Sequence, residues 1–470
     1  MDHSVRRNFS YDTESLWQKD RDHIIHPWIE LGTAKTKEPL VIAESEGPYI
    51  YDSTGNRMLD AMGGMWCVNV GYGREEIAQA IADQARRLAY FSPFGIISSP
   101  PSIELGDRLV EYTPGDLDHI FYTTGGSTAV DSAIRYVYFY NNCLGRTEKK
   151  HIICREYGYH GSTYISASLS GKPGDLPFMD RKTDTIHHLP APNTYRRPEG
   201  MTEAEFLEYT VKQLEDKILA IGPENVAAFI AEPVLASGGV IMPPKGYQKR
   251  TLEVCRKYDV LYISDEVVTG FGRCGEMFAS EKVFDIVPDI ITSAKGLTSG
   301  YVPLGAVFIS SRIFEPLVGE AGKNKFFANG FTYSAHPVAC AAGLANLDIM
   351  EREDICGHVR KVGPYFQEKV RTLLELPLVG DVRGLGMMLC VEFVKDRKTK
   401  EICPAEWEVG NRIIRQTMKR GLMIRPMGHL AVLSPTLIVT KDHVDEMVSI
   451  MREAVGAVMD DLKREGLWNG

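Results

Sequence analysis

The sequence predicts an α/β protein with a large domain around a mostly parallel central sheet and a smaller α+β domain built from both chain ends. Two observations lead to this fold class. Short apolar segments alternate with helical ones through the middle of the chain, which is typical of a parallel sheet covered on both faces. The chain also has 470 residues, more than one simple core requires. We expect residues 1–65 to form an N-terminal arm and meander, 66–336 the large domain, and 337–470 the rest of the smaller domain.

An arm, a meander and a helix are expected before the central sheet. The first ~35 residues are polar with scattered aromatic side chains, a composition typical of an arm that packs on another surface. Apolar runs between Val41 and Asp60 are broken at two turn-forming segments, which predicts a small antiparallel meander. From Ile77 to about Ala89 the apolar spacing becomes helical.

Six apolar segments predict the central sheet, and helical segments lie between most of them. The expected strands are His119–Thr124, His151–Arg155, Ala227–Pro233, Val260–Asp265, Asp289–Ser293 and Leu304–Ser310. Helices are expected at 130–141 and 202–219, among others. After Pro337 the composition becomes helical and charged, with a strand expected at Met387–Val394 and a final helix from His443 to about Leu467.

Composition and charge argue against several classes of function. The net charge is −9 with both signs interspersed, which argues against nucleic acid as the main partner. The polar N-terminus lacks the apolar segment of a secretory signal. The richest apolar stretch, Val226–Met242, contains Glu232 and falls short of a membrane span. Nine cysteines, an odd number without a CxxC pair, favour reduced thiols. We therefore expect a cytoplasmic protein without a membrane partner and without a metal site.

An acid and an amine are expected at the ends of neighbouring strands. One apolar strand ends at Asp265, and the next leads to Lys295 about 30 residues later. Open α/β sheets place their chemistry at such carboxyl ends. An enzyme that uses pyridoxal 5'-phosphate (PLP) needs this pair, because a lysine amine forms a Schiff base with the cofactor and a carboxylate keeps the pyridine nitrogen protonated. We interpret Lys295 and Asp265 as catalytic residues, although either residue alone would be unremarkable.

Three further segments fit the same cofactor. Gly126 and Ser127 follow a strand and open a helix, so free backbone N–H groups and a hydroxyl would suit a phosphate group. Tyr159 follows another strand end, where an aromatic ring can stack on a flat cofactor. Glu232 comes directly after a buried apolar run and needs partners. Each segment also has an ordinary structural explanation, as a turn, a packed ring or a solvated strand end.

In this order, the residues resemble the class III aminotransferases, PLP enzymes of fold type I, and within them the ω-amino acid or amine:pyruvate transaminases. The resemblance covers nearly the whole chain. The segments that carry it include Met65–Gly73, Tyr159–Gly161, Glu232–Val234, Asp265–Val267, Lys295–Gly296, Gly330–Ser334 and His336–Pro337.

The resemblance implies a role for each matching residue at the cofactor. Lys295 would be the Schiff-base lysine and Asp265 the partner of the pyridine nitrogen. Val267 and Tyr159 would pack on opposite faces of the ring, and Gly126 and Ser127 would form the phosphate cup, with Glu232 close by. Thr332 would reach the phosphate from the neighbouring subunit. The family resemblance therefore implies a homodimer with two shared active sites, or a tetramer of such dimers.

The resemblance also implies a substrate pocket. Its aromatic residues would be Trp28, Trp66, Phe94, Tyr159 and Phe331, with Phe94 and Phe331 from the partner subunit.

Arg425 matches a mobile arginine of the family, and a guanidinium suits the carboxylate of a keto acid. Ser237 stands where the branch that uses 2-oxoglutarate has a glutamate, which favours pyruvate as acceptor. The expected reaction therefore transfers nitrogen from a primary amine or ω-amino acid to pyruvate, giving an aldehyde or ketone and L-alanine. β-Alanine, taurine, diamines and arylalkyl amines are all candidate donors.

One departure and several alternatives accompany this hypothesis. After the phosphate turn the chain has Thr128 and Val130 where the family often has glutamate and asparagine, so local hydrogen bonding must differ. An aminomutase or racemase of the same family, a 2-oxoglutarate-using aminotransferase and a non-catalytic PLP-fold binding module stay open. A nucleotide-binding dehydrogenase is disfavoured because the glycine turn lacks the G-x-G-x-x-G spacing.

Overall fold

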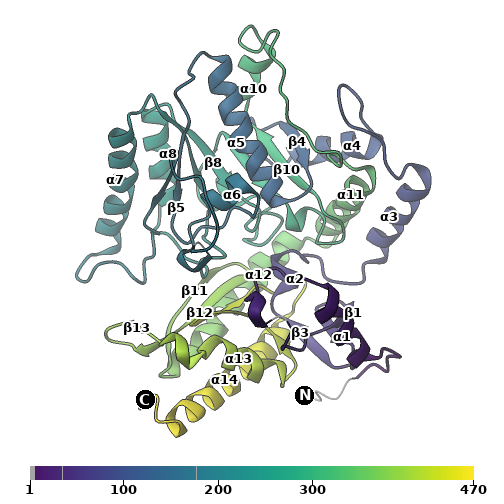
Figure 1. Cartoon of the computed structure of the whole chain (residues 1–470), viewed down its shortest axis with the longest axis vertical. Coiled ribbons are helices and arrows are strands. Elements are labelled where there is room, and N and C mark those ends of the chain that lie inside the picture. Colours follow the sequence, from purple (N-terminus) through teal and green to yellow (C-terminus); the bar gives the residue numbers. More distant parts are fainter. Residues whose placement is uncertain (1–5, 34, 176, 470) are drawn as a thin grey trace.

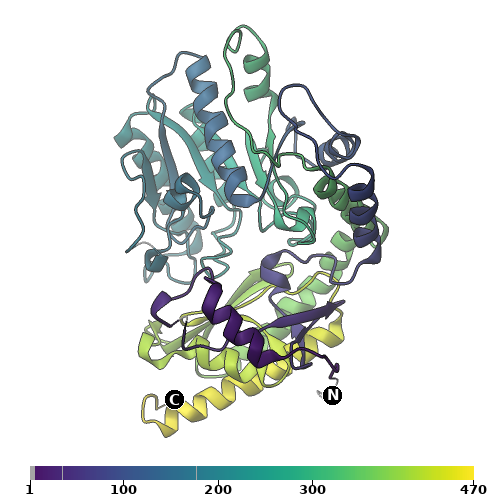
Figure 2. The ribbon, with the colours of Figure 1, turned by 45° about the vertical axis from the view of Figure 1, so that its right-hand side comes forward.

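The computed structural model describes residues 6–33, 35–175 and 177–469. In Figures 1 and 2 the purple N-terminal and yellow C-terminal segments lie together in the lower part of the molecule, and the teal central sheet lies in the upper part. The fold class expected from the sequence, a large mostly parallel sheet with a smaller domain from both chain ends, is confirmed. The expected boundaries of the domains stay a prediction.

The central sheet has seven strands in the order β4-β10-β9-β8-β7-β5-β6. Five adjacent strands, from β9 to β6, run parallel to one another, whereas β10 is antiparallel to both β4 and β9. The strands are β4 (His119–Thr123), β5 (His151–Arg155), β6 (Ile186–Leu189), β7 (Val226–Ala231), β8 (Leu261–Asp265), β9 (Ile290–Ser293) and β10 (Gly305–Ile309). All six expected strands are therefore present within a few residues of their expected bounds.

Strand β6 was not predicted from the sequence. It is only four residues long, lies at the edge of the sheet, and carries His187 and His188 in its middle, both of which are half-buried. A short edge strand with two polar residues lacks the apolar run that identifies the buried strands. Its pairing with β5 depends on tertiary structure instead.

Helices cover both faces of this sheet because successive strand residues point to opposite sides. On one face, Ile152 and Ile263 pack with the apolar side of α5 (Gly126–Cys143). On the other face, Ile153 and Phe229 pack with α7 (Glu203–Ile221) and α8 (Tyr247–Lys257). These two layers hold the strand ends in fixed positions.

The smaller domain joins the two chain ends through one sheet. The expected meander is present as three antiparallel strands, and β14 from near the C-terminus pairs in parallel with β3. A second sheet has the order β11-β12-β16-β15, and β13 pairs with β12. The strands are β1 (Ile42–Glu46), β2 (Tyr49–Asp52), β3 (Arg57–Asp60), β11 (Val379–Leu385), β12 (Met388–Asp396), β13 (Glu401–Ile402), β14 (Leu422–Met423), β15 (Arg425–Met427) and β16 (Leu430–Leu433).

The other helices largely agree with the expectations. The helix expected near Ile77 is α3, and the expected C-terminal helix is α14, which begins two residues earlier than expected. The expected arm contains the helix α1, which has no buried residue and therefore shows no clear apolar pattern. The helices are α1 (Thr13–His23), α2 (Gly63–Trp66), α3 (Glu75–Arg87), α4 (Pro100–Val110), α6 (Tyr164–Leu169), α9 (Ala279–Lys282), α10 (Ser311–Val318), α11 (Pro337–Arg352), α12 (Ile355–Arg371), α13 (Val409–Met418) and α14 (Lys441–Arg464). Within the described residues, no helix combines the length and apolar character that crossing a membrane requires.

Candidate active site

The strand ends that carry the expected chemistry meet at one edge of the central sheet. Strand β8 ends at Asp265, while Lys295 and Glu232 follow the ends of β9 and β7. These strands are parallel neighbours, so their carboxyl ends face the same way. Strand β5, parallel to β7, brings the loop with Tyr159 to the same edge. Strand order and direction thus gather residues that lie more than 100 positions apart in the sequence.

A cavity of about 150 Å³ lies among these strand ends. Seven of the eight residues predicted to bind the cofactor line it, and Thr332 is the exception. The lining residues are Gly126, Ser127, Tyr159, His160, Gly161, Glu232, Asp265, Val267, Val268 and Lys295.

Lys295 lies in a short turn directly after β9, held in a strained backbone conformation. Its φ is +48°, in the left-handed region that few side chains adopt. A Cβ atom on the next residue, Gly296, would lie 2.3 Å from Nδ2 of Asn69, so only glycine allows this close approach. Burial lowers the pKa of the Lys295 amine, although the charge of Asp265 opposes this effect. A lowered pKa increases the share of neutral, nucleophilic amine.

Asp265 is fixed by two hydrogen bonds. Nδ1 of His160 donates to Oδ2 of Asp265 at 2.7 Å, and the Val267 N–H donates to Oδ1 at 3.2 Å. The side chains of His160 and Asp265 are 1% and 3% exposed, so water does not compete for this contact. Sequence reasoning assigned no role to His160, because nothing near it in the sequence indicates a partner 105 residues away.

Glu232 is buried and joins two loops of the cavity. Its Oε1 accepts a hydrogen bond from the backbone N–H of Tyr159 at 2.9 Å, and its Oε2 accepts one from Ala236 N–H at 3.0 Å. Burial raises the pKa of its carboxyl group, and the charge of nearby His160 opposes the rise. Glu232 thus fixes the Tyr159 loop and the loop that leads to Ser237.

The start of α5 has the shape of an anion cradle. The first turn of a helix leaves its backbone N–H groups without intrahelical partners, and Gly126 and Ser127 occupy that turn at the cavity wall. A Cβ atom at Gly126 would lie 2.9 Å from Cγ1 of Val267, so a larger residue would close the space between them. The Thr128 hydroxyl donates to the Gly125 carbonyl at 2.9 Å, a bond within the turn that leaves the cradle open. These residues fit a phosphate-bearing cofactor.

Three of the residues predicted to bind substrate, Trp28, Ser237 and Arg425, lie beside this cavity. The Trp28 ring packs edge-on against the Tyr159 ring with centroids 5.8 Å apart. Nη1 of Arg425 donates to Oγ of Ser237 at 3.4 Å. Burial lowers the pKa of Arg425, whereas the charges of Tyr159 and Asp175 favour its protonated form.

The other predicted residues lie away from the cavity lining in this single chain. Trp66 is 2% exposed and packs in a cluster with Val234 and Leu430. Phe94 is exposed, and a Cβ atom at Gly330 would lie 2.8 Å from its ring. The carbonyl of Thr332 accepts a hydrogen bond from Tyr90 at 2.7 Å. The neighbouring Phe331 is half-buried. The roles expected for Trp66, Phe94, Phe331 and Thr332 stay predictions.

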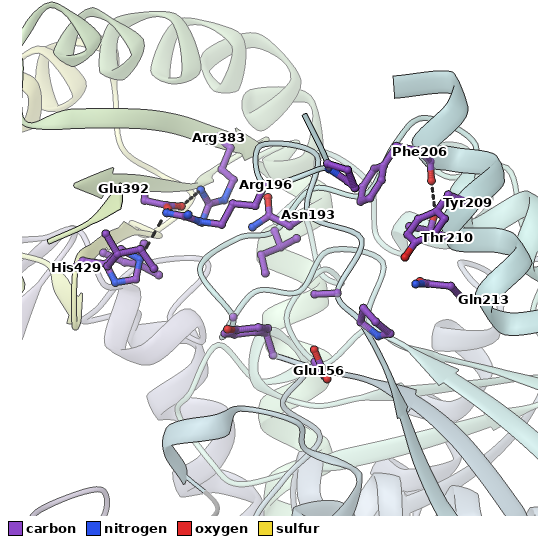
Figure 3. Close-up of a pocket in the computed structure, with 18 residues that line it drawn as sticks. Glu156, Asn193, Arg196, Phe206, Tyr209, Thr210, Gln213, Arg383, Glu392 and His429 are labelled. Atoms are coloured by element: carbon purple, nitrogen blue, oxygen red, sulfur yellow. Dashed lines mark hydrogen bonds and ion pairs between the residues drawn. The ribbon is translucent and has the colours of Figure 1, made fainter. Parts of the chain in front are cut away.

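A second cavity, of about 320 Å³, lies between the two domains. Figure 3 shows Phe206, Tyr209 and Gln213 of α7 on one side of it and Arg383, Glu392 and His429 of the smaller domain on the other. Gly238 also lines this cavity, directly after Ser237 of the first site.

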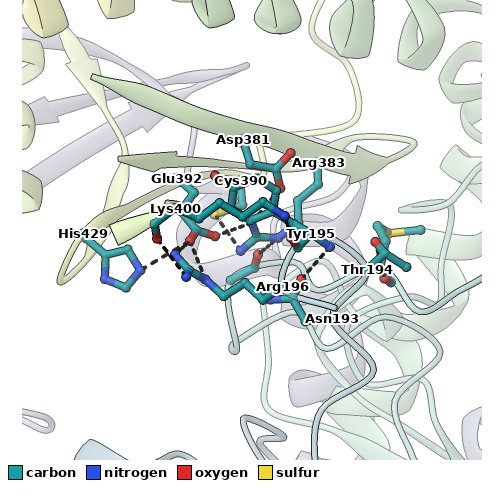
Figure 4. Close-up of polar contacts among 12 residues, drawn as sticks. Asn193, Thr194, Tyr195, Arg196, Asp381, Arg383, Cys390, Glu392, Lys400 and His429 are labelled. Carbon is teal, nitrogen blue, oxygen red and sulfur yellow. Dashed lines mark hydrogen bonds and ion pairs between the residues drawn. The ribbon is translucent and has the colours of Figure 1, made fainter. Parts of the chain in front are cut away.

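A network of charges crosses the domain interface beside the second cavity. Figure 4 shows Glu392 of β12 between Arg196 of the large domain and Arg383 of β11. Nε of Arg196 donates to Glu392 Oε1 at 2.9 Å, and Nη1 of Arg383 donates to Oε2 at 2.5 Å. Nζ of Lys400 also reaches across to the carbonyl of Tyr195 at 2.7 Å. Sequence reasoning missed this network because its members lie up to about 200 residues apart.

Comparison with known proteins identifies the family. A family model described as aminotransferase class-III matches residues 32–455. The chain belongs to the class III aminotransferases. This family uses PLP, so the site at the carboxyl end of the sheet belongs to a PLP enzyme.

This aminotransferase is similar to other aminotransferases over most of the length of both chains. An uncharacterized aminotransferase, y4uB of Sinorhizobium fredii, is 42% identical over 97% of this chain and 99% of its own. The mitochondrial gamma-aminobutyrate transaminase 1 of Oryza sativa subsp. indica is 42% identical over 89% of this chain and 81% of its own.

Two solved structures give the same result. A thermostable (S)-enantioselective omega-transaminase from Thermomicrobium roseum has a TM-score of 0.92 at 40% identity, covering 96% of this chain and 99% of that one. The omega transaminase from Pseudomonas jessenii in complex with PMP has a TM-score of 0.93 at 36% identity, covering 97% and 100%.

Proposed function

We propose that this class III aminotransferase moves an amino group from a primary amine or ω-amino acid to pyruvate, giving an aldehyde or ketone and L-alanine. The observation that supports pyruvate as the acceptor is the environment of Arg425. Its hydrogen-bond partner is the Ser237 hydroxyl, and among the described residues Arg425 forms no ion pair with a carboxylate, although the charge of Asp175 acts on it. Its guanidinium is therefore available for the single carboxylate of pyruvate. The neighbouring omega-transaminase structures support the donor class.

We further propose the following roles at the cofactor. Bound PLP supplies an electron sink for the pair released from the substrate carbon. Nζ of Lys295 would take the proton from that carbon and deliver it to C4′ of the cofactor, as its lowered pKa permits. Asp265 presents its carboxylate to the pyridine nitrogen, and His160 keeps that carboxylate in a fixed orientation.

The remaining residues position and enclose the reactants. Tyr159 and Val267 both line the cavity and would pack on opposite faces of the cofactor ring, while Gly126 and Ser127 would offer N–H and hydroxyl groups to the phosphate. Glu232 holds the loop of Tyr159 through its backbone. Trp28 and Trp66 belong to the substrate side.

We propose a homodimer as the active form, because Thr332, Phe94 and Phe331 lie outside the cavity of their own chain. From a second copy, Thr332 would reach the phosphate and the two rings would cover the substrate pocket. A cytoplasmic location is our proposal too, supported by nine cysteines that are all free thiols in the described chain.

The gamma-aminobutyrate transaminases among the relatives favour a second candidate within this reaction class. In it, 4-aminobutyrate is the donor and a different keto acid, such as 2-oxoglutarate, is the acceptor. Donor and acceptor are therefore tested separately.

The deciding experiment follows the visible spectrum of the PLP-loaded enzyme through both halves of the reaction. Donors of each class are added first, including 4-aminobutyrate and an arylalkyl amine, and then pyruvate or 2-oxoglutarate. We expect the cofactor band to disappear with a donor and to return with pyruvate. Return with 2-oxoglutarate alone would overturn the acceptor proposal. A band that never responds to amines would favour a binding module, and formation of isomerised amine without a keto product would indicate a mutase.

A further inference from the structure

Lys172 is a mostly buried cation at the edge of the active site that the proposed mechanism does not use. Its side chain is 16% exposed, and its only ion pair among the described residues is with Asp175, at 3.4 Å. Lysine is rarely buried without a close partner, because desolvation of an ammonium group is costly. Burial accordingly lowers the pKa of Lys172, although the charge of Asp175 opposes this. A weakly compensated ammonium group is suited to binding an anion.

The position of Lys172 relative to the site is fixed by backbone hydrogen bonds. Gly171 donates its N–H to the Gly158 carbonyl at 2.9 Å and accepts from Tyr157 N–H at 3.0 Å. The segment that follows α6 is thereby tied to the loop that carries Tyr159. The position of Lys172 therefore depends on the same loop that forms one wall of the catalytic cavity.

The ammonium group of Lys172 lies over two aromatic rings of the substrate side. Its Nζ is 5.1 Å from the Trp28 ring centroid and 5.4 Å from that of Tyr159. Cation–π contacts of this kind hold a cation in place without neutralising it. Lys172 therefore keeps its positive field while its side chain is restrained beside the mouth of the cavity.

Arg425 is close enough to Lys172 for their charges to interact. Arg425 disfavours the protonated form of Lys172, and the carboxylate of Asp175 favours the protonated form of both. The mouth of the cavity thus has two cations that repel each other and one carboxylate, Asp175, which pairs with Lys172 and acts on Arg425 only through its charge. An incoming anion would relieve this repulsion.

We propose that Lys172, together with Arg425, binds the distal acidic group of an ω-amino acid donor, a carboxylate or a sulfonate. Lys172 is thus a specificity-determining residue that selects donors with an anion at the end remote from the amine. This inference rests on the proposed transaminase function and narrows its donor class. Asp175 competes with the substrate anion for the two cations and sets how strongly they bind it.

Two variants that should change the KM for anionic donors in opposite directions test the inference. In Lys172→Met the apolar stem is retained and the charge is lost. We expect the KM for β-alanine and 4-aminobutyrate to rise about fivefold, the effect of losing one charge contact with the substrate, while kcat changes little. The KM for an uncharged arylalkyl amine should change less than about twofold, within the effect of lost side-chain packing. In Asp175→Asn the KM for the anionic donors should fall instead, because the competing carboxylate is gone.

Matched controls separate a charge effect from a structural one. Lys172→Arg should keep the wild-type KM for the anionic donors, since charge and length are retained. Lys182→Met removes a lysine that pairs with Asp184 at 3.0 Å further along the same segment, and should leave every KM unchanged.

The possible outcomes are distinct. Equal changes for anionic and uncharged donors in Lys172→Met would overturn the inference, as would a wild-type enzyme that uses propylamine better than β-alanine. In either case turnover of amines would leave the proposed transaminase function standing. If the wild-type enzyme turned over no donor of either kind, both the inference and the proposed function would be wrong.

Discussion

Nη1 of Arg425 lies 3.4 Å from the hydroxyl oxygen of Ser237, although the two residues are 188 positions apart in the sequence. The contact is long and links a charged donor to a neutral acceptor, so it restrains Arg425 only weakly. An arginine held in this way can turn toward a carboxylate or away from an uncharged substrate. This relationship between Ser237 and Arg425 leads to the first two predictions.

Replacement of Arg425 by alanine should impair the reaction with pyruvate more than the reaction with uncharged amines. Loss of a charge-assisted contact of ~1.5–3 kcal/mol predicts a KM for pyruvate that is roughly tenfold higher or more. The half-reaction with an arylalkyl amine should keep its rate within about threefold, since an uncharged substrate makes no ion pair. Single-turnover spectra of each half-reaction measure the two effects separately. Equal losses in both would contradict a role in carboxylate recognition.

Replacement of Ser237 by glutamate should place a carboxylate next to Arg425 and neutralise it. We expect kcat/KM for pyruvate to fall, and the ratio of 2-oxoglutarate to pyruvate use to rise. Ser237→Ala is the control, because it removes the weak hydrogen bond without adding charge and should leave the acceptor ratio nearly unchanged. An acceptor ratio that is the same in the glutamate and alanine variants would count against our interpretation of this position.

Replacement of Lys295 by alanine should abolish turnover while leaving the fold and the phosphate cradle intact. PLP should still bind through the start of α5, but it should dissociate on gel filtration because no covalent link to the protein can form. Absorbance of the protein fraction and an alanine-formation assay together check both effects. Activity above a few per cent of wild type would exclude Lys295 as the catalytic amine. Lys182→Met, at a lysine that pairs with Asp184 outside the site, is the control that should stay active.

Replacement of His160 by phenylalanine should lower kcat without abolishing cofactor binding. His160 holds Oδ2 of Asp265 at 2.7 Å in a site from which water is excluded, so its loss frees the carboxylate to move. Misplacement of a catalytic group by about 1 Å costs up to ~100-fold in rate, and we expect a decrease between about tenfold and that value. Steady-state kinetics of the PLP-saturated variant measure it. A variant with wild-type kcat would show that Val267 N–H alone orients Asp265.

These sites differ in how far the sequence could predict them. Asp265, Lys295 and Glu232 follow buried apolar strands, so their meeting at one sheet edge was expected once the strands were recognised. The role of His160 could not be predicted, because its partner comes from another strand and no local pattern marks the pair. Lys172 was also missed, since a lysine in a glycine- and proline-rich loop is normally exposed. Only tertiary structure shows that it is mostly buried, with its ammonium group over two aromatic rings.

The smaller domain shows the same limit. The meander between Val41 and Asp60 was predicted from turn residues, but its parallel pairing with β14 joins segments about 360 residues apart. Likewise, the aromatic residues expected in the substrate pocket separated into Trp28 at the mouth and Trp66 in a packed cluster. Family resemblance supplied their expected role, whereas burial depends on packing that the sequence does not display.

The last prediction concerns the free energy of unfolding and the charges at the domain interface. Burial alone would raise the pKa of Glu392, but contact with His429 and the charges of Arg383 and Arg196 lower it to about 2, against an ordinary value of 4.5. Because the folded-state pKa is depressed, this carboxylate stabilises the fold above pH 4.5. Its contribution is lost as the pH falls from 4.5 toward about 2.

Replacement of Glu392 by glutamine should therefore destabilise the protein most at neutral pH. The variant removes the carboxylate that Arg196 and Arg383 share, while Arg383 keeps its ion pair with Asp381 at 2.8 Å. Removal of one partner from a buried ion pair costs ~3–5 kcal/mol. Thermal unfolding at fixed protein concentration, repeated from pH 7 downward, measures the difference from wild type. That difference should be constant above pH 4.5 and shrink below it as wild-type Glu392 takes up a proton. Glu401→Gln, at an exposed ion pair with Lys395, is the control and should change stability by less than about 1 kcal/mol. A Glu392→Gln deficit that stays constant below pH 4.5 would mean that packing of the side chain, and not its charge, holds the two domains together.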